Sequence, residues 1–376
     1  MNPDRLLIYS AVFAIMGLSN SVIPILPELA AQDNGAFGAL ASSLLFSGYF
    51  LGALVTMLPF GILADRFGNL RFIGLGILLT AGSGLALLLS GNLLVLLASR
   101  FVEGAACGAF FPAAFATLSK FRDPGRRMGE FTFLFNAGLA AGALFSGLLA
   151  GTNLKGAIFI FTVMTFLLIF PLLSRHRELV GSGSQGKTVK GNEPDSLAEI
   201  FRHASGGVER LLRGRNSRVW ILSTLLNGAV GVMIAYYPDY SAGLLTKAQL
   251  GSSIASLYVC AMITSLGVGR FAIGEWSMIR IGIAFSALGT LLAIDYPLLG
   301  FSSLGGGSGI AIVGFALAVA RMDADRGLAM GLFNTSIYAG LSLTPIVAGL
   351  FTGLLSFEEI FLANGLILAG TLFIRN

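Results

Sequence analysis

Residues 61–71 read GILADRFGNLR and separate two long apolar segments, residues 36–60 and 72–90. The short stretch carries the charged residues Asp65, Arg66 and Arg71, whereas both flanking segments carry no charge at all. The hydrocarbon core of a bilayer is about 30 Å thick and a helix rises about 1.5 Å per residue, so about 20 apolar residues span it. The pattern therefore predicts a tight polar turn between two membrane-spanning helices.

The same pattern extends along the whole chain. Of 376 residues, 55% are hydrophobic and only 11% are charged, whereas soluble domains carry about 25% charged residues. This composition, with a mean hydropathy of +0.83, excludes an ordinary soluble enzyme and a disordered chain. No segment alternates as the strands of a membrane barrel would. The predicted fold class is an all-α integral membrane protein with twelve spans, at residues 6–27, 36–60, 72–90, 93–118, 128–151, 156–173, 219–241, 250–271, 278–294, 297–320, 327–353 and 357–374.

The distribution of basic residues predicts the orientation of these spans. With twelve spans, 21 of the 24 lysines and arginines fall in loops on one side, and only Lys155 and Lys247 fall on the other. Because cytoplasmic loops are enriched in lysine and arginine, we expect a multi-pass protein of the cell membrane with both termini in the cytoplasm. The net charge of +5 then reflects sidedness and does not indicate a nucleic-acid partner.

The only long polar segment divides the chain into two parts. Residues 174–217 include the flexible tract GSGSQG at 181–186, followed by an apolar pattern that predicts a short amphipathic helix on the cytoplasmic face. We expect a six-helix bundle over residues 1–173, this linker, and a second six-helix bundle over residues 218–376.

The two parts resemble each other at a fixed offset. Gly129, Gly138, Gly147 and Gly151 recur 202 residues later, as Gly331, Gly340, Gly349 and Gly353. The pair Pro27-Glu28 at the end of the first span also matches Pro238-Asp239 at the end of the seventh. The repeat predicts two pseudo-symmetric bundles with a substrate path between them near the middle of the membrane.

The turn at residues 61–71 resembles the signature loop G-x-L-A-D-R-x-G-R-K of the major facilitator superfamily. It matches at Gly61, Asp65, Arg66 and Gly68, while the usual basic pair is reduced to Arg71. The resemblance implies a transporter fold and a cytoplasmic gate formed by this motif. We expect Asp65 to face the positive end of the eleventh span at Gly327, and Arg66 to pair with a carboxylate such as Asp123.

Two further segments resemble drug:proton antiporters with twelve spans. Residues 22–28, VIPILPE, resemble a P-x-L-P element. Residues 138–148 resemble the antiporter motif G-xxx-G-P-xxx-G-G, with Ala143 in place of the proline and Leu148 in place of the last glycine. Glycines at this spacing also allow close helix packing in lipid. Both interpretations, packing and an antiport-specific role, remain open from the sequence.

Arg100 and Glu103 form the one charged cluster at mid-membrane depth. They lie three residues apart in the fourth span and share a helix face with Cys107. Charged residues are costly at this depth, so they indicate function by default. Three roles fit: a protonatable Glu103 modulated by Arg100, a substrate contact, or a structural ion pair. The spacing Arg100-xxx-Gly104-xxx-Gly108 also resembles the superfamily's fourth-span motif, in which the arginine is implicated in proton movement.

A cavity with so few charges predicts a lipophilic or weakly polar small molecule as cargo. Neutral polar candidates for its lining, each of which could instead bond between helices, are Asn20, Tyr49, Asn136, Asn227, Tyr258, Asn334 and Tyr338. We expect no metal and no cofactor, because both histidines lie in the linker and no phosphate-binding loop occurs. We also expect a monomer without enzyme activity.

The predicted function is secondary active transport by alternating access, as proton-coupled efflux. A nutrient or metabolite importer and an uncoupled facilitator of the same fold are the alternatives. A channel, a receptor or a membrane enzyme is a remote alternative. The sequence shows neither a re-entrant selectivity-filter segment nor a cluster of histidine, aspartate or cysteine at one membrane interface.

Overall fold

The computed structural model describes residues 3–31, 38–174, 217–268, 273–322 and 326–373. The predicted amphipathic helix of the linker lies outside these residues. The first half of the chain forms α1 (Pro3–Ser21), η1 (Ile23–Ile25), α2 (Leu26–Ala30), α3 (Gly38–Phe67), α4 (Asn69–Leu89), α5 (Leu93–Leu118), α6 (Pro124–Leu149) and α7 (Gly156–Leu173). The second half forms α10 (Ser217–Tyr240), α11 (Lys247–Val268), α12 (Glu275–Leu292), α13 (Pro297–Ala320), α14 (Arg326–Gly349), α15 (Phe357–Gly370) and η5 (Thr371–Phe373).

Every predicted span coincides with a helix, and the described residues contain no strand. Counting α1 to α2 as one interrupted span, the described residues contain twelve helical segments that correspond to the predicted spans. Nine of them are long and apolar enough to cross a membrane by themselves, judged on the described residues. The predicted all-α membrane fold is confirmed.

Prolines interrupt the first span near its end. Pro24 lies in η1 and Pro27 at the start of α2. Because proline has no N–H to donate, it breaks the regular hydrogen bonding of a helix. The first span therefore ends as three short pieces, α1, η1 and α2, and this break presents backbone carbonyl groups to neighbouring helices.

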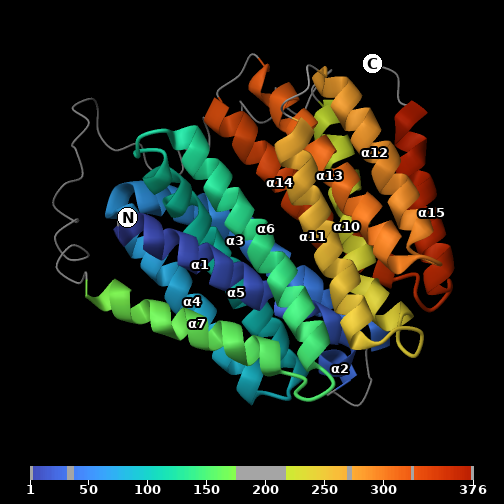
Figure 1. Ribbon diagram of the computed structural model, residues 1–376, viewed down its shortest axis with the longest axis horizontal. Coiled ribbons are helices and arrows are strands. Elements are labelled where there is room, and N and C mark those ends of the chain that lie inside the picture. The colour runs from blue at the N-terminus through green and yellow to red at the C-terminus, as the bar shows by residue number, and fades with distance from the viewer. Residues whose placement is uncertain (1–2, 32–37, 175–216, 269–272, 323–325, 374–376) are drawn as a thin grey trace.

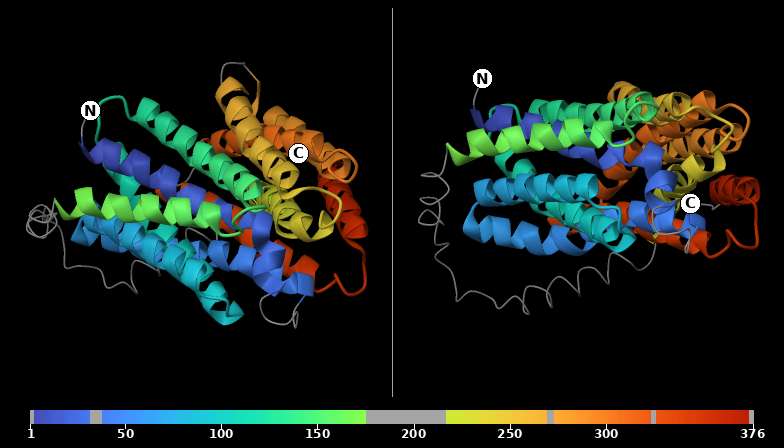
Figure 2. Two further views of the ribbon diagram at one scale, coloured as in Figure 1. Left: turned by 60° about the horizontal axis from the view of Figure 1, so that its bottom comes forward. Right: turned by 90° about the horizontal axis from the view of Figure 1, so that it is seen from below.

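The bundle has two ends, which we name by their contents. The motif end carries the start of α1 and the turn between α3 and α4, and the latch end carries α2 and the start of α11. The first half, blue to green, and the second half, yellow to red, form two bundles that diverge toward the motif end (Figures 1 and 2). They are in contact mainly through α6 against α11 and through α14 against α3.

The internal repeat explains these contacts. Gly138 lies against the carbonyl of Phe13 in α1, and its repeat equivalent Gly340 lies against the carbonyl of Thr224 in α10. In each half, the fifth helix thus packs on the first through the same glycine.

The second pair of repeated glycines lies between the halves. Gly147 of α6 packs on Gly251 of α11, and its equivalent Gly349 of α14 packs beside Ser43 of α3. The glycines of α6 therefore serve close packing: Gly138 packs on α1, and Gly147, nine residues later, packs on the opposite half. The two bundles are pseudo-symmetric, as the repeat predicts.

Candidate functional site

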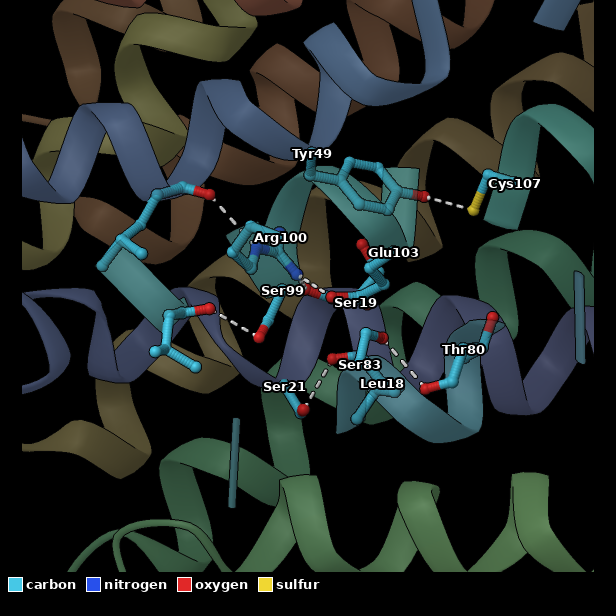
Figure 3. A network of polar contacts seen from close by, with 12 residues as sticks. Leu18, Ser19, Ser21, Tyr49, Thr80, Ser83, Ser99, Arg100, Glu103 and Cys107 are labelled. Atoms are coloured by element: carbon cyan, nitrogen blue, oxygen red, sulfur yellow. Dashed lines mark hydrogen bonds and ion pairs between the residues drawn. The ribbon is translucent and has the colours of Figure 1, made fainter. Parts of the chain in front are cut away.

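Arg100 and Glu103 form an ion pair inside the first half (Figure 3). The Arg100 Nη1 atom lies 2.6 Å from Glu103 Oε2. Arg100 is 1% exposed and Glu103 is fully buried, so neither charge is solvated by water. Isolated charges would be very costly in such surroundings, and pairing offsets part of that cost. The predicted proximity of the two side chains on one face of α5 is confirmed.

The guanidinium group also joins three helices. Its Nε donates to the carbonyl of Leu45 in α3 at 3.1 Å, and Nη1 donates to the carbonyl of Ser19 in α1 at 3.3 Å. Ser19 lies in the last turn of α1, where carbonyl groups lack partners within the helix. The Tyr49 ring lies 4.9 Å from the Arg100 Cζ atom, in position for a cation–π interaction. Arg100 therefore fixes α1 and α3 relative to α5.

Glu103 uses only one of its two oxygens in this arrangement. Oε2 accepts from Arg100, whereas Oε1 is buried and has no hydrogen-bond partner. One helical turn further on, the Tyr49 hydroxyl and the Cys107 Sγ atom are 3.0 Å apart (Figure 3). The site thus combines an ion pair, an unpartnered carboxylate oxygen and a tyrosine–cysteine pair.

A glycine allows α3 to come this close to α5. A Cβ atom at Gly104 would overlap the carbonyl oxygen of Tyr49. Only glycine permits such a backbone approach, so Gly104 places Tyr49 above Arg100. The Arg100-xxx-Gly104 spacing is therefore explained by helix packing as well as by charge.

Two candidate tyrosines contribute contacts across the boundary between the halves. Tyr338 of α14 lies with its ring centroid 6.1 Å from that of Phe50 in α3, and the Phe50 ring in turn lies 4.9 Å from the ring of Tyr49. The Tyr258 hydroxyl of α11 donates to the Asn20 Oδ1 atom of α1 at 3.2 Å. The structure therefore brings Asn20, Tyr49, Tyr258 and Tyr338 to the interface of the two bundles.

The other three candidates form no described hydrogen bond to these four residues. The amides of Asn136 and Asn227 donate to carbonyl groups of their own helices, at Thr132 and Ser223. Asn334 is exposed on α14. Nothing in these contacts gathers the three asparagines with the Arg100 site, and their role as cavity residues stays a prediction.

The gate motif differs in detail from its predicted form. α3 continues to Phe67, so Asp65 lies in its last helical turn rather than in a loop, and Gly68 alone connects α3 with α4. Gly68 has φ 96°, a conformation that favours glycine. Gly61 packs against Pro112 of α5. Arg71 lies in the first turn of α4.

The predicted gate contacts of the motif are not formed in the described part of the chain. Asp65 and Arg66 are exposed, and neither forms an ion pair with a described residue. The predicted pair between Arg66 and Asp123 is not formed: Asp123 precedes α6 with φ 60° and is also exposed. The surroundings of Gly327 lie outside the described side chains. The divergence of the two halves toward the motif end bears only on Asp65 and the eleventh span. Arg66 and Asp123 both lie in the first half, and both side chains are exposed.

An ion pair that no sequence pattern indicates joins the two halves. Lys247 Nζ of α11 lies 2.6 Å from Glu28 Oε1 of α2, and it donates to the carbonyl of Pro24 at 2.9 Å. In the sequence, Glu28 belongs to the repeated proline–carboxylate pair and ends the segment at residues 22–28. Because the partners lie 219 positions apart, no local pattern could join them.

Comparison with known proteins agrees with this architecture. Residues 8–322 match the sequence pattern of the Major Facilitator Superfamily. The chain belongs to this superfamily. The twelve helical spans of the described residues, the two pseudo-symmetric halves and the turn at residues 61–71 fit the fold of a transporter of this superfamily.

Proteins with similar sequences align with either the whole chain or a part of it. The chain is 25% identical to an uncharacterized MFS-type transporter of Methanocaldococcus jannaschii over 96% of this chain and 94% of that protein. It is 23% identical to the quinolone resistance protein NorA of Staphylococcus aureus, over all of this chain and 96% of NorA. It is 32% identical to a putative inorganic phosphate cotransporter of Drosophila melanogaster, but over 31% of this chain and only 22% of that protein.

Solved superfamily structures share the fold at low sequence identity. The nucleoside transporter NupG aligns over 98% of both chains with a TM-score of 0.77 and 14% identity. A POT family transporter, solved with 5-aminolevulinic acid, aligns over 99% of this chain and 94% of its own with a TM-score of 0.76 and 15% identity.

Proposed function

We propose that this chain exports a lipophilic or weakly polar small molecule in exchange for protons, by alternating access. In this proposal the basic motif end faces the cytoplasm and the latch end faces outside. The structure then corresponds to the inward-facing state, because the halves are joined at the latch end and diverge toward the motif end. The full-length similarity to NorA supports efflux as the direction of transport.

The observation that carries the proposal is the state of Glu103. It is fully buried, one oxygen is held by Arg100, and the other has no partner. A carboxyl group in such a position can bind a proton on the free oxygen while the other oxygen keeps its hydrogen bond from Arg100; the ion pair then becomes a hydrogen bond to a neutral acid. Tyr49 and Tyr338 connect this site to the interface of the halves, where an alternating-access carrier binds its substrate.

In the proposed cycle, Glu103 takes up a proton in the outward-facing state and releases it in the inward-facing state. Arg100 stabilises the ionised form and, through the carbonyl groups of Ser19 and Leu45, transmits the change to α1 and α3. Cargo binds between the halves beside Tyr49 and Tyr338. The Asp65 motif closes the cytoplasmic end in the outward-facing state.

A second candidate is import of an anionic or polar metabolite. The local similarity to an inorganic phosphate cotransporter favours it, and Arg100 would then be the substrate-binding cation. One observation disfavours this candidate. Glu103 already neutralises Arg100, so an anionic substrate would have to displace the Glu103 carboxylate to bind the guanidinium group.

The test is proton movement in proteoliposomes that contain the purified protein and an internal pH dye. Lipophilic cations, neutral drugs, nucleosides and phosphate are added in turn. We expect a lipophilic compound to drive proton movement in the wild type and not in Glu103→Gln, with Glu358→Gln at the exposed start of α15 as the matched control. Transport of labelled substrate without any proton signal, or coupling that survives Glu103→Gln, would overturn the proposal. Phosphate uptake would favour the second candidate.

A further inference from the structure

The latch end holds a second group of charges, half-buried between the halves, that the proposed function does not use. Lys247 of α11 pairs with Glu28 of α2 and donates to the Pro24 carbonyl. The break in the first span at Pro24 and Pro27 presents this carbonyl toward α11. The segment at residues 22–28 is thus the docking site of an ammonium group from the opposite half.

A second carboxylate lies beside this pair. Glu28 and Lys247 are the charges that act on Asp239, in the last turn of α10, and Ser42 of α3 lies next to its carboxyl group. Two buried carboxylate oxygens of this group have no hydrogen-bond partner: Asp239 Oδ2 and Glu28 Oε2. Two carboxylates therefore lie near one ammonium group, which forms its ion pair with Glu28, and the three charges sum to one negative when both carboxylates are ionised.

The two carboxylates belong to different halves. Asp239 and Lys247 both lie in the second half, whereas Glu28 lies in the first. When the halves part at the latch end, Lys247 must leave Glu28 but stays with Asp239. An ionised Asp239 can then take over the ammonium group, while Glu28 is solvated by water. The cost of opening therefore depends on whether Asp239 carries a charge.

We propose that Asp239 is the proton-binding residue of this latch. Ionised Asp239 competes with Glu28 for Lys247 and favours opening of the latch end. Protonated Asp239 cannot compete, and it removes the excess negative charge, so that it favours closure. One proton is bound from the solvent on closure and given back on opening, and only an O–H bond forms or breaks.

The remaining surroundings of Asp239 are uncharged in the described part of the chain. Tyr236, one turn earlier in α10, donates its hydroxyl to the Pro345 carbonyl at 2.8 Å, and α3 contributes Ser42 and Ser43. Glu28 and Lys247 are therefore the charged groups that a protonation of Asp239 affects. The inference deepens the proposed function and rests on it only for the side of the membrane that supplies the proton.

The experiment measures the width of the latch end as a function of pH. Spin labels are attached at Thr152→Cys, in the exposed turn after α6, and at Leu244→Cys, 67% exposed before α11. Cys260 is replaced by alanine, and Cys107, fully buried, is retained. Distances are recorded in lipid nanodiscs without substrate, from about pH 5 to about pH 8, because one linked proton changes the ratio of open to closed by up to about tenfold per pH unit.

In the wild type we expect the open fraction to rise with pH. Asp239→Asn should stay closed throughout, Glu28→Gln should be open throughout, and Glu358→Gln should titrate like the wild type. An Asp239→Asn protein that titrates normally, or a wild type whose distance does not change with pH, would overturn the inference. If Asp239→Asn fails to fold, Glu28→Gln still decides: a closed, titrating latch in that variant contradicts the competition for Lys247.

The outcome is separable from the test of the proposed function. Glu103→Gln should abolish proton-coupled transport and leave the titration of the latch intact. Loss of the titration in Glu103→Gln would assign the proton to Glu103 rather than to Asp239. Conversely, a latch that titrates normally in a protein without coupled transport would contradict the proposed function alone.

Discussion

Gly147 of α6 lies directly against Gly251 of α11, so that no side chain separates the two halves of the chain at this point. A Cβ atom at either position would overlap the backbone of the opposite helix. The contact lies at the latch end, close to Lys247, whose backbone carbonyl also faces Gly147. Closure of this end thus depends on the absence of two side chains as much as on an ion pair.

Replacing Gly147 should wedge the latch end open. We expect Gly147→Leu to disfavour the closed state by about 1–3 kcal/mol, the usual cost of overpacking. The distance between labels at Thr152→Cys and Leu244→Cys should lengthen as a result. Gly151→Leu is the control, because a Cβ atom at Gly151 meets nothing within 4 Å. Equal distances in the two variants would contradict the role of the glycine contact.

Removing one partner of the Arg100–Glu103 pair should destabilise the protein. Arg100→Met leaves a buried carboxylate without its counter-ion, which typically costs about 3–5 kcal/mol. The double variant Arg100→Met with Glu103→Gln should recover much of this loss, because no charge then remains unpaired. Unfolding in detergent, followed by circular dichroism, measures both. A double variant no more stable than Arg100→Met would show that packing, rather than charge, dominates.

The hydrogen bond between Tyr258 and Asn20 should stabilise the observed state of the two halves. Tyr258→Phe removes the hydroxyl and should shift the equilibrium away from this state by about 0.5–1.5 kcal/mol, the net value of an ordinary hydrogen bond. The label distances at the latch end report the shift. Tyr240→Phe is a suitable control, since its hydroxyl bonds Ile294 within the second half. An unchanged equilibrium in Tyr258→Phe would assign the tyrosine another role.

Lys155 should matter for the stability of the first half. Its Nζ atom donates to the carbonyl groups of Leu87, Leu88 and Ser90, where α4 ends, and burial lowers the pKa of this lysine. Lys155→Met leaves these carbonyls without that donor and should cost about 1–3 kcal/mol. Thermal unfolding in detergent tests this, with the exposed Lys120→Met as control. Equal melting temperatures would contradict the capping role.

Asp65 should affect transport more than stability. It is exposed and unpaired with any described residue in this state, so Asp65→Asn should change the unfolding free energy by less than about 0.5 kcal/mol. Because the motif closes the cytoplasmic end in the outward-facing state of the proposed cycle, the same variant should still slow transport severalfold. Transport by proteoliposomes and unfolding of the same preparation give the two values. A variant that transports at the wild-type rate would exclude the gate role of Asp65.

The sequence alone determined the architecture of this protein. Long apolar segments leave a chain few options in lipid, because every backbone polar group must be bonded within a helix or a closed barrel. The number of spans and the repeat of Gly138 and Gly147 at Gly340 and Gly349 follow from spacing along the chain. The shared face of Arg100 and Glu103 follows from helical geometry, since residues three apart are neighbours.

Only the tertiary structure decided which helices meet, and in which state. Lys247 and Glu28, or Tyr258 and Asn20, are joined by packing between halves, and no local pattern encodes a contact across more than 200 residues. The packing also decided that Asp65 is exposed while Gly147 and Gly251 touch. Spans and faces are set by local geometry and by the solvent, whereas the joined end of the bundle depends on the balance of contacts at its two ends.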